Sequence, residues 1–191
     1  MQSRAKILGL ILAGGEGRRV SNRDKGLLHW QGKPLVTHVI ERLSDQVSDI
    51  ILSCNRNTSQ YAEFGLELVH DQREGFNGPL AGLESAMEFN RKHVLVVVPC
   101  DTPLLPMDLV SRLLQPLVDS AGDDRDISYA SDGLREHYLC AAIRPGIIAS
   151  VSDQLDSGQR SVRAWYSQHR PAIVDFSDQP EAFRNINRME K

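Results

Sequence analysis

Residues 6–25 read KILGLILAGGEGRRVSNRDK, in which an apolar run leads directly into a loop rich in glycine and basic residues. The apolar run at 7–12 is typical of a strand that is covered on both faces of a parallel sheet. Gly14, Gly15 and Gly17 let the backbone approach a ligand closely, so several N–H groups can converge on one anion. The stretch therefore predicts a loop that binds phosphate groups at the end of a buried strand.

The second half of this loop contains four basic residues within eight positions: Arg18, Arg19, Arg23 and Lys25. Lysine supplies a compact charge and arginine a two-pronged donor, and together they suit a triphosphate. Two familiar phosphate motifs do not fit. A P-loop needs Gly-Lys followed by Ser or Thr, whereas Lys25 here precedes Gly26. Only the first two glycines of a dinucleotide fingerprint are present, which disfavours a dinucleotide site.

The rest of the chain alternates between short apolar runs and segments with helical periodicity. This alternation predicts right-handed βαβ crossovers and a three-layer α/β/α sandwich with a mostly parallel, Rossmann-like sheet. The length of 191 residues favours a single domain over residues 1–191. Strands are expected at 7–12, 49–54, 66–69, 93–98, 127–130, 138–143 and 172–176, and helices at 35–44, 61–64, 80–90, 107–119, 146–155 and 161–168.

The composition is that of a globular protein, with 41% apolar residues, 25% charged residues and a net charge of −3. This charge gives no reason to expect a nucleic-acid or membrane-surface partner, so the basic residues serve the loop. Without an apolar run of membrane-spanning length or a signal-peptide pattern, a cytoplasmic protein is expected. Cys54, Cys100 and Cys140 form no CxxC pair, and we expect them to be buried apolar residues.

Polar residues follow several predicted strands, at the edge where α/β sheets bind their ligands. Asp101 follows the strand at 93–98, where a carboxylate could hold Mg²⁺ or, alternatively, cap a turn or helix. Lys25 and Arg19 could stabilise charge on an α-phosphate and a departing pyrophosphate. Asp71 could contact a base, a ribose or a metal, or could only cap the following turn.

The loop at 12–28, LAGGEGRRVSNRDKGLL, resembles the signature loop of the NTP transferases. Its LAGG start and its Asp-Lys-Gly end are similar to those of the molybdenum cofactor guanylyltransferases. The GPLAG stretch at 78–82 is similar to a motif of the same family. The two motifs together support guanine as the base of the bound nucleotide, because related cytidylyltransferases carry other residues at both positions. The resemblance covers nearly the whole chain and continues at 99–103, 158–161 and 185–187. Departures are Ser53, where relatives often have Asn, and Val20-Ser21, where they often have Met-Gly.

The resemblance implies a nucleotidyltransferase that moves GMP from Mg·GTP to the molybdopterin cofactor and releases pyrophosphate, without a covalent enzyme intermediate. It implies that the part up to about residue 105 binds GTP and Mg²⁺, and that the part from about 106 to 191 faces the pterin substrate. The implied catalytic residues are Lys25, Asp101 and Arg19, with Asp101 as the metal ligand. The implied GTP-binding residues are Leu12, Ala13, Gly14, Gly15, Lys25, Ser53, Asn55, Asp71, Gly78, Leu80, Gly82 and Asp101. The implied pterin-binding residues are Arg160, Asn185 and Asn187.

The resemblance also implies a monomer with transient contacts to other proteins of molybdenum cofactor synthesis and to molybdoenzyme chaperones. Whether Ser53 or Asn55 meets the nucleotide stays open. Two other functions also stay open: a cytidylyl- or sugar-phosphate nucleotidyltransferase on the same fold, and a non-catalytic nucleotide-sensing protein. Competition by CTP or UTP would identify the first. The presence of Asp101 together with Lys25 and Arg19 in one sequence disfavours the second, because binding alone does not need the metal ligand.

Overall fold

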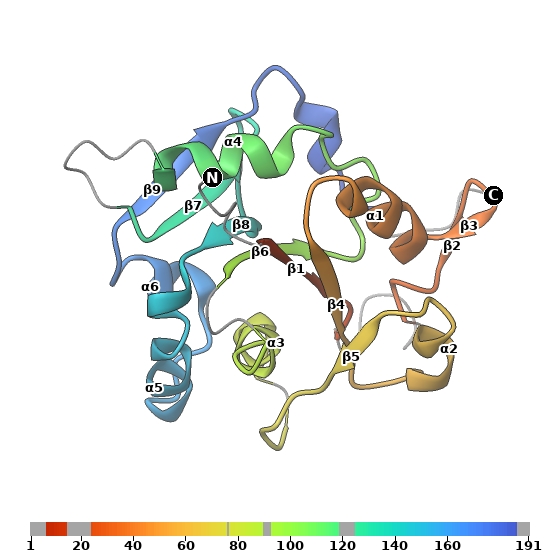
Figure 1. Cartoon of the computed structure of the whole chain (residues 1–191), viewed down its shortest axis with the longest axis horizontal. Helices are drawn as coiled ribbons and strands as arrows, with labels where there is room; N and C mark the ends of the chain where they lie inside the picture. Colours follow the sequence, from red (N-terminus) through yellow and green to blue (C-terminus); the bar gives the residue numbers. More distant parts are fainter. Residues whose placement is uncertain (1–6, 15–23, 76, 90–92, 119–124, 187–191) are drawn as a thin grey trace, which may run out of the picture.

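The computed structural model describes residues 7–14, 24–75, 77–89, 93–118 and 125–186, and a seven-stranded sheet runs through the molecule (Figure 1). In spatial order its strands are β5 (Glu67–Val69), β4 (Asp49–Ser53), β1 (Ile7–Leu12), β6 (Val94–Pro99), β8 (Glu136–Ile143), β7 (Ile127–Ser131) and β9 (Pro171–Asp175). A separate two-stranded ribbon pairs β2 (His29–Trp30) with β3 (Lys33–Pro34).

The sheet is mostly parallel, as predicted. β1 pairs in parallel with β4 on one side and with β6 on the other, and the pairs β4–β5 and β7–β9 are also parallel. Leu12, at the end of β1, lies level with Ser53 of β4 and Pro99 of β6, so the three strands end together. β8 runs antiparallel to both of its neighbours, β6 and β7. The direction of this strand is not encoded in its apolar pattern, and it was not predicted.

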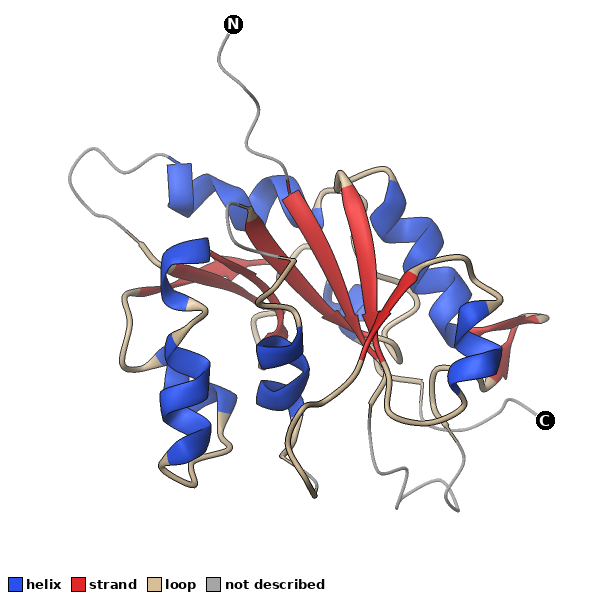
Figure 2. Ribbon diagram, turned by 60° about the horizontal axis from the view of Figure 1, so that its bottom comes forward, coloured by secondary structure: helices blue, strands red, loops and turns tan. Residues whose placement is uncertain are grey.

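Helices cover both faces of the sheet (Figure 2). They are α1 (Leu35–Ser44), α2 (Thr58–Ala62), α3 (Pro79–Ser85), α4 (Leu109–Val118), α5 (Ser150–Asp156) and α6 (Val162–Tyr166), with 3₁₀ turns η2 (Pro145–Ile147) and η3 (Pro180–Phe183). Side chains of α1 and α4 share one core cluster with Ile11, and those of α3, α5 and α6 share a second with Leu8 and Leu10. Because side chains of a strand alternate between its faces, the two clusters lie on opposite sides of the sheet. The predicted three-layer sandwich is confirmed.

Some predicted helices are shorter than expected. The helix predicted at 80–90 ends as α3 at Ser85, because the N–H groups of Ala86, Met87 and Phe89 bond to carbonyls three residues back, the tighter 3₁₀ spacing. The helix predicted at 146–155 is divided into η2 and α5. All three cysteines are buried and free, as expected. In the described ranges, the helices are too short or too polar to cross a membrane.

Candidate active site

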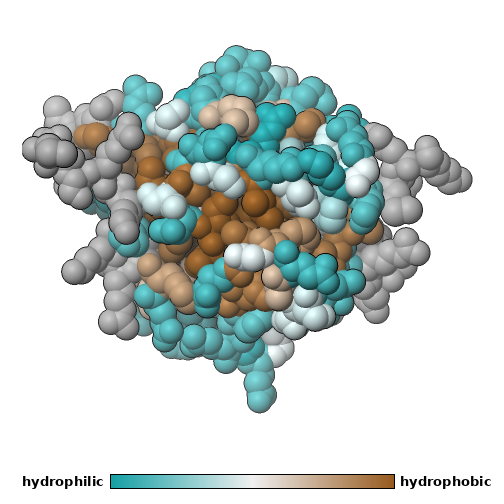
Figure 3. All heavy atoms as spheres, turned by 45° about the vertical axis from the view of Figure 1, so that its right-hand side comes forward, coloured by the Kyte–Doolittle hydropathy of each residue, from teal (hydrophilic) through white to brown (hydrophobic). Residues whose placement is uncertain are grey.

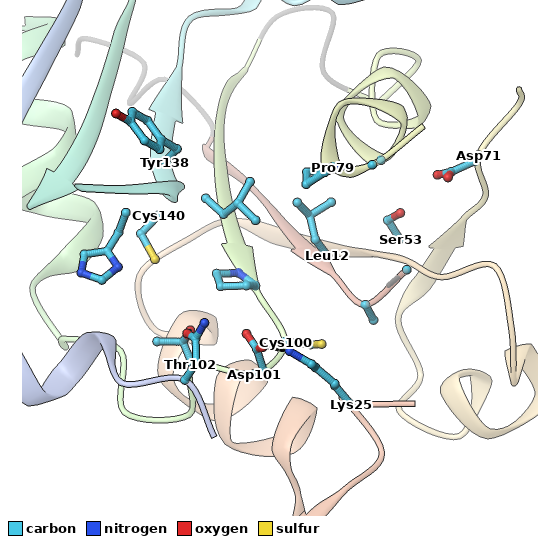
Figure 4. Close-up of a pocket in the computed structure, with 18 residues that line it drawn as sticks. Leu12, Lys25, Ser53, Asp71, Pro79, Cys100, Asp101, Thr102, Tyr138 and Cys140 are labelled. Atoms are coloured by element: carbon cyan, nitrogen blue, oxygen red, sulfur yellow. Dashed lines mark hydrogen bonds and ion pairs between the residues drawn. The ribbon is translucent and has the colours of Figure 1, made fainter. Parts of the chain in front are cut away.

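A cavity of about 390 Å³ lies at the carboxyl ends of β1, β4 and β6 (Figure 4). A cavity of this size suits a small molecule rather than a polymer. Leu12, Pro79 and Leu139 give it apolar walls, and carboxylate, ammonium, hydroxyl and amide groups converge on it. Figure 3 shows apolar residues gathered in a hollow on one face of the molecule, with hydrophilic residues around the rim.

Lys25 and Asp101 form an ion pair in this cavity, with Lys25 Nζ 3.0 Å from Asp101 Oδ2 (Figure 4). Asp101 lies just beyond the end of β6 and is only 7% exposed. Lys25 lies just after the glycine-rich loop, in a turn that precedes β2. The structure therefore brings together two of the three residues for which a catalytic role was predicted.

The carboxylate of Asp101 is suited to a divalent cation. Mg²⁺ usually takes one or two protein carboxylates and completes its shell with water and with phosphate oxygens of a substrate. Across the described segments, no group of three or more His, Cys, Asp or Glu side chains forms a complete metal site. Asp101 is therefore the carboxylate in the described cavity wall that we expect to contact such an ion.

Ser53 and Asn55 hold different positions at the end of β4. Ser53 is 1% exposed and lines the cavity. Asn55 Oδ1 accepts a hydrogen bond of 2.9 Å from the backbone N–H of Asp71, which ties together the segments that follow β4 and β5. A Cβ atom on Gly14 would lie 3.2 Å from the Asn55 Nδ2 atom, so Asn55 also packs closely on the loop after β1. Ser53 is thus the residue in the cavity wall, and nucleotide contact by either residue stays a prediction.

The glycines of the GPLAG motif lie on the cavity side of α3. Gly78 and Gly82 line the cavity, and a Cβ atom on Gly82 would lie 2.6 Å from Leu12 Cδ2 and 3.0 Å from Ser53 Oγ. Leu80 has no exposed surface and belongs to the core cluster beneath α3. Its side chain therefore packs into the core, and any contact of Leu80 with a nucleotide falls to its backbone.

Asp71 lines the cavity beyond the end of β5. Burial raises the pKa of its carboxyl group, and the hydrogen bond with Asn55 opposes this effect. Because burial disfavours the charged form, the carboxylate gains from any ligand that donates hydrogen bonds to it. Contact of Asp71 with a base, a ribose or a metal stays a prediction, as does the alternative that it only caps the following turn.

Of the residues predicted to face the pterin, one lies in the described cavity wall. Asn185 lines the cavity, and its Oδ1 atom accepts a 2.9 Å hydrogen bond from the hydroxyl of Thr102. The next residue, Ile186, donates its backbone N–H to the carbonyl of Asp101. Arg160 is exposed and donates from Nε to Asn77 Oδ1 at 3.1 Å, and it is not part of the described cavity lining. Gly15, Arg19 and Asn187 lie outside the described residues.

One wall of the cavity comes from the start of β8 and was not predicted. It consists of His137, Tyr138, Leu139 and Cys140. The His137 ring stacks on Phe183 with 4.7 Å between centroids, and its Nε2 atom lies 2.8 Å from Asp132 Oδ2. Because β8 is antiparallel, its first residues lie at the sheet edge where the parallel strands end. Only the strand direction, which the apolar pattern lacks, could have revealed this wall.

The sheet, with a Lys–Asp pair in a cavity where its parallel strands end, places the protein among the α/β enzymes that bind nucleotides. Residues 9–173 match the family model described as the MobA-like NTP transferase domain. A molybdenum cofactor guanylyltransferase of Shewanella halifaxensis is 42% identical over 98% of this chain and 92% of its own length. That of Shewanella piezotolerans is 44% identical over 95% of this chain and 88% of its own. The chain belongs to the MobA-like NTP transferase family and is a nucleotidyltransferase.

Solved structures share this fold. Molybdopterin-guanine dinucleotide biosynthesis protein A from Archaeoglobus fulgidus has a TM-score of 0.74 at 21% identity, over 94% of this chain and 92% of that one. A CMP:2-keto-3-deoxy-manno-octonic acid synthetase complexed with CTP has a TM-score of 0.65 at 17% identity, over 91% and 90% of the two chains. At these identities the likeness concerns the fold alone.

Proposed function

We propose that this chain transfers GMP from GTP to the terminal phosphate of the molybdopterin cofactor and releases pyrophosphate. The observation that carries the proposal is the Lys25–Asp101 pair in a cavity of small-molecule size. The guanine and pterin specificities are supported by the 42% and 44% identity to molybdenum cofactor guanylyltransferases over nearly the whole chain.

The reaction is a direct displacement at phosphorus. An oxygen of the acceptor phosphate forms a bond to the α-phosphorus of GTP. The bond between this phosphorus and the oxygen that bridges to the β-phosphate breaks, and pyrophosphate leaves with the electron pair. No protein nucleophile is required, so positioning and electrostatic stabilisation supply most of the acceleration.

Lys25 places its ammonium group against the phosphates and stabilises the charge that develops on the departing pyrophosphate. Asp101 is the residue that would hold Mg²⁺. When bound there, Mg²⁺ supplies positive charge to the phosphate oxygens of GTP. Arg19, from the loop between Gly14 and Asp24, is proposed as a further cation on the phosphates, where its planar guanidinium can bind two oxygens at once.

We assign the part up to about residue 105 to GTP and Mg²⁺ and the part from about residue 106 onward to the acceptor. The cavity supports this division, because Ser53 and Asp71 lie on one side of it and Tyr138 on the other (Figure 4). Leu12, Ala13 and Gly14 complete the described nucleotide side. We propose that Gly15 also binds GTP. Of the residues predicted to face the pterin, Asn185 lies in the described cavity wall. We propose that Arg160 and Asn187 contact the acceptor once it is bound.

We further propose that the protein works as a cytoplasmic monomer on these two small molecules. The net charge of −3 fits a protein without a nucleic-acid partner. Contacts with other proteins of cofactor synthesis and delivery are expected to be transient, and light scattering of the purified protein would test the monomer.

The proposal is tested by incubating the purified protein with GTP, Mg²⁺ and the molybdopterin cofactor and identifying the product by mass spectrometry. We expect molybdopterin guanine dinucleotide, with one pyrophosphate for each dinucleotide formed. A chelator should stop the reaction, and added Mg²⁺ should restore it. GTP binding without any product, or transfer to a sugar phosphate instead of the pterin, would contradict the proposal.

A further inference from the structure

The carboxylate of Asp24, next to Lys25, is held by three donors from different parts of the chain. Asp24 Oδ1 accepts hydrogen bonds from Tyr61 Oη at 2.5 Å and from the Gly26 backbone N–H at 3.2 Å. Asp24 Oδ2 accepts a hydrogen bond from Asn57 Nδ2 at 3.2 Å. Neither Asp24 nor Tyr61 is part of the described cavity lining. These contacts therefore fix the chain beside the site without reaching a ligand in it.

Tyr61 gives this carboxylate a rigid anchor. It lies on α2, has no exposed surface and belongs to the core cluster that α1 and α4 share. Burial is the main reason that the pKa of the Tyr61 phenol is raised far above its ordinary value. The hydroxyl therefore stays protonated and donates to Asp24 over the whole working pH range.

The backbone on the other side of Lys25 is fixed equally well. A Cβ atom on Gly26 would lie 2.5 Å from Tyr61 Oη and 3.4 Å from Cys100 Sγ, so only glycine fits here without displacing its neighbours. The Gly26 carbonyl accepts a 2.9 Å hydrogen bond from the Val36 N–H at the start of α1. Cys100 directly precedes Asp101. Tyr61 and Cys100 thus set the position of Gly26 relative to the residue that Lys25 faces.

We propose that Asp24 and Tyr61 are positioning residues that hold Lys25 in the cavity opposite Asp101. Lysine has a long, flexible stem, and placing its ammonium group against a phosphate costs conformational entropy. An anchored backbone on both sides of Lys25 restricts where that group can go before GTP arrives. This inference rests on the proposed role of Lys25 in GTP binding, although it does not depend on which acceptor receives the nucleotide.

A graded series of variants separates this role from a general effect on the fold. Asp24→Ala removes all three hydrogen bonds, and Tyr61→Phe removes one. Asp24→Asn keeps an oxygen that can accept from both Tyr61 and Gly26. If hydrogen bonding matters rather than charge, GTP affinity measured by equilibrium dialysis should fall roughly 10-fold in Asp24→Ala and roughly 5-fold in Tyr61→Phe. Asp24→Asn should lie within about twofold of the wild type.

The decisive test is a double-mutant cycle with Lys25→Met, again on GTP affinity. If Tyr61 acts through Lys25, Tyr61→Phe should change the affinity of the Lys25→Met protein by less than about twofold. An equal loss in both backgrounds, or no loss in the wild-type background, would overturn the proposal. Ser128→Ala is the matched control, because Ser128 is a fully buried hydroxyl that donates to the Leu113 carbonyl away from the cavity. It should leave GTP affinity unchanged.

Thermal melts of all variants show whether each protein is folded. If Tyr61→Phe fails to fold, the comparison of Asp24→Ala with Asp24→Asn decides the question, because a charge effect predicts equal losses and positioning predicts rescue by Asn. GTP binding is measured here without an acceptor, so the test is independent of guanylyl transfer. If the effects of Tyr61→Phe and Lys25→Met on GTP affinity are coupled but the protein forms no dinucleotide, only the proposed function is contradicted.

Discussion

The Nζ atom of Lys25 lies 3.0 Å from Oδ2 of Asp101, although the two residues are 76 positions apart in the sequence. The side chain of Asp101 is only 10% exposed and that of Lys25 30%. An unpaired charge at such depth would be costly, so the pair keeps both charges compensated at the proposed GTP site. The first predictions concern these two residues.

Replacing Asp101 by Asn should lower turnover by roughly 100-fold or more while the protein stays folded, because the carboxylate that would hold Mg²⁺ is lost. Pyrophosphate release at saturating GTP measures this. Glu41→Gln is the matched control, because it also replaces a carboxylate that pairs with a lysine, but at an exposed position. Lys33 Nζ lies 2.6 Å from Oε1 of Glu41, which is on α1. We expect that control to keep full activity. Near-normal turnover by a folded Asp101→Asn protein would remove Asp101 from the mechanism.

Replacing Lys25 by Met should weaken kcat/KM for GTP by roughly 100-fold, because charge on the phosphates is no longer neutralised. Lys25→Arg should recover only part of the loss. Arginine keeps the charge, but its planar fork does not fit a position built for a compact ammonium group. Steady-state kinetics at several GTP concentrations separates kcat from KM. Full activity of Lys25→Met would show that the phosphates bind elsewhere.

Gly82→Ala should raise the KM for GTP roughly 10-fold, because the added methyl group would lie 2.6 Å from Leu12 Cδ2 and 3.0 Å from Ser53 Oγ. Both neighbours line the cavity, so the substitution displaces its wall. Gly146→Ala is the control, because a Cβ atom there meets no atom within 4 Å among the described residues. An unchanged KM in folded Gly82→Ala protein would show that the nucleotide does not use this wall.

Arg73 holds the loop between Asp71 and Gly78 against two helices. Its Nε and Nη2 atoms donate to the carboxylate of Glu84 on α3, both at 2.7 Å, and its Nη1 atom donates to Asp156 Oδ1 on α5 at 2.5 Å. We expect Glu84→Gln to lower the Tm at neutral pH by roughly 2–5 °C. The KM for GTP should rise as well, because Asp71 and Gly78 both line the cavity.

The effect of Glu84→Gln on stability should depend on pH. The hydrogen bond from Arg73 lowers the pKa of Glu84 below its ordinary value of 4.5, against the opposing effect of burial. The stabilisation is therefore fully present above the ordinary pKa and is lost as pH falls through the lowered value. Urea unfolding of both proteins at about pH 7 and about pH 3.5 should show a smaller difference at the lower pH. An equal difference at both would contradict the role of the charged pair.

The sheet could be predicted from the sequence because its central strands are nearly continuous apolar runs, as in β1 and β6. The carboxyl ends of parallel strands meet at one edge, so the gathering of Gly14, Asp71 and Asp101 at one cavity followed from the predicted topology. The wall that contains His137 did not follow, because the apolar pattern of β8 carries no information about strand direction. The antiparallel course of β8 brings that wall to the site.

The GPLAG motif shows a second limit of sequence reasoning. Treated as one unit, it predicted nucleotide contacts for Gly78, Leu80 and Gly82. α3 begins at Pro79, and Gly78 precedes it as the N-cap with a non-helical backbone. Gly78 and Gly82 line the cavity, while the side chain of Leu80 fills the core, so the predicted contact of Leu80 with GTP concerns its backbone. Similarly, the hydrogen bond from Tyr61 to Asp24 joins residues 37 positions apart, and no local sequence pattern predicts it.

The measurement that tests guanylyl transfer most directly is pyrophosphate release by the purified protein with Mg²⁺, the molybdopterin cofactor and each of the four NTPs in turn. We predict release with GTP and none above background with ATP, CTP or UTP. Release with CTP but not GTP would contradict the assignment of guanine. GTP binding without release from any of the four would contradict catalysis itself.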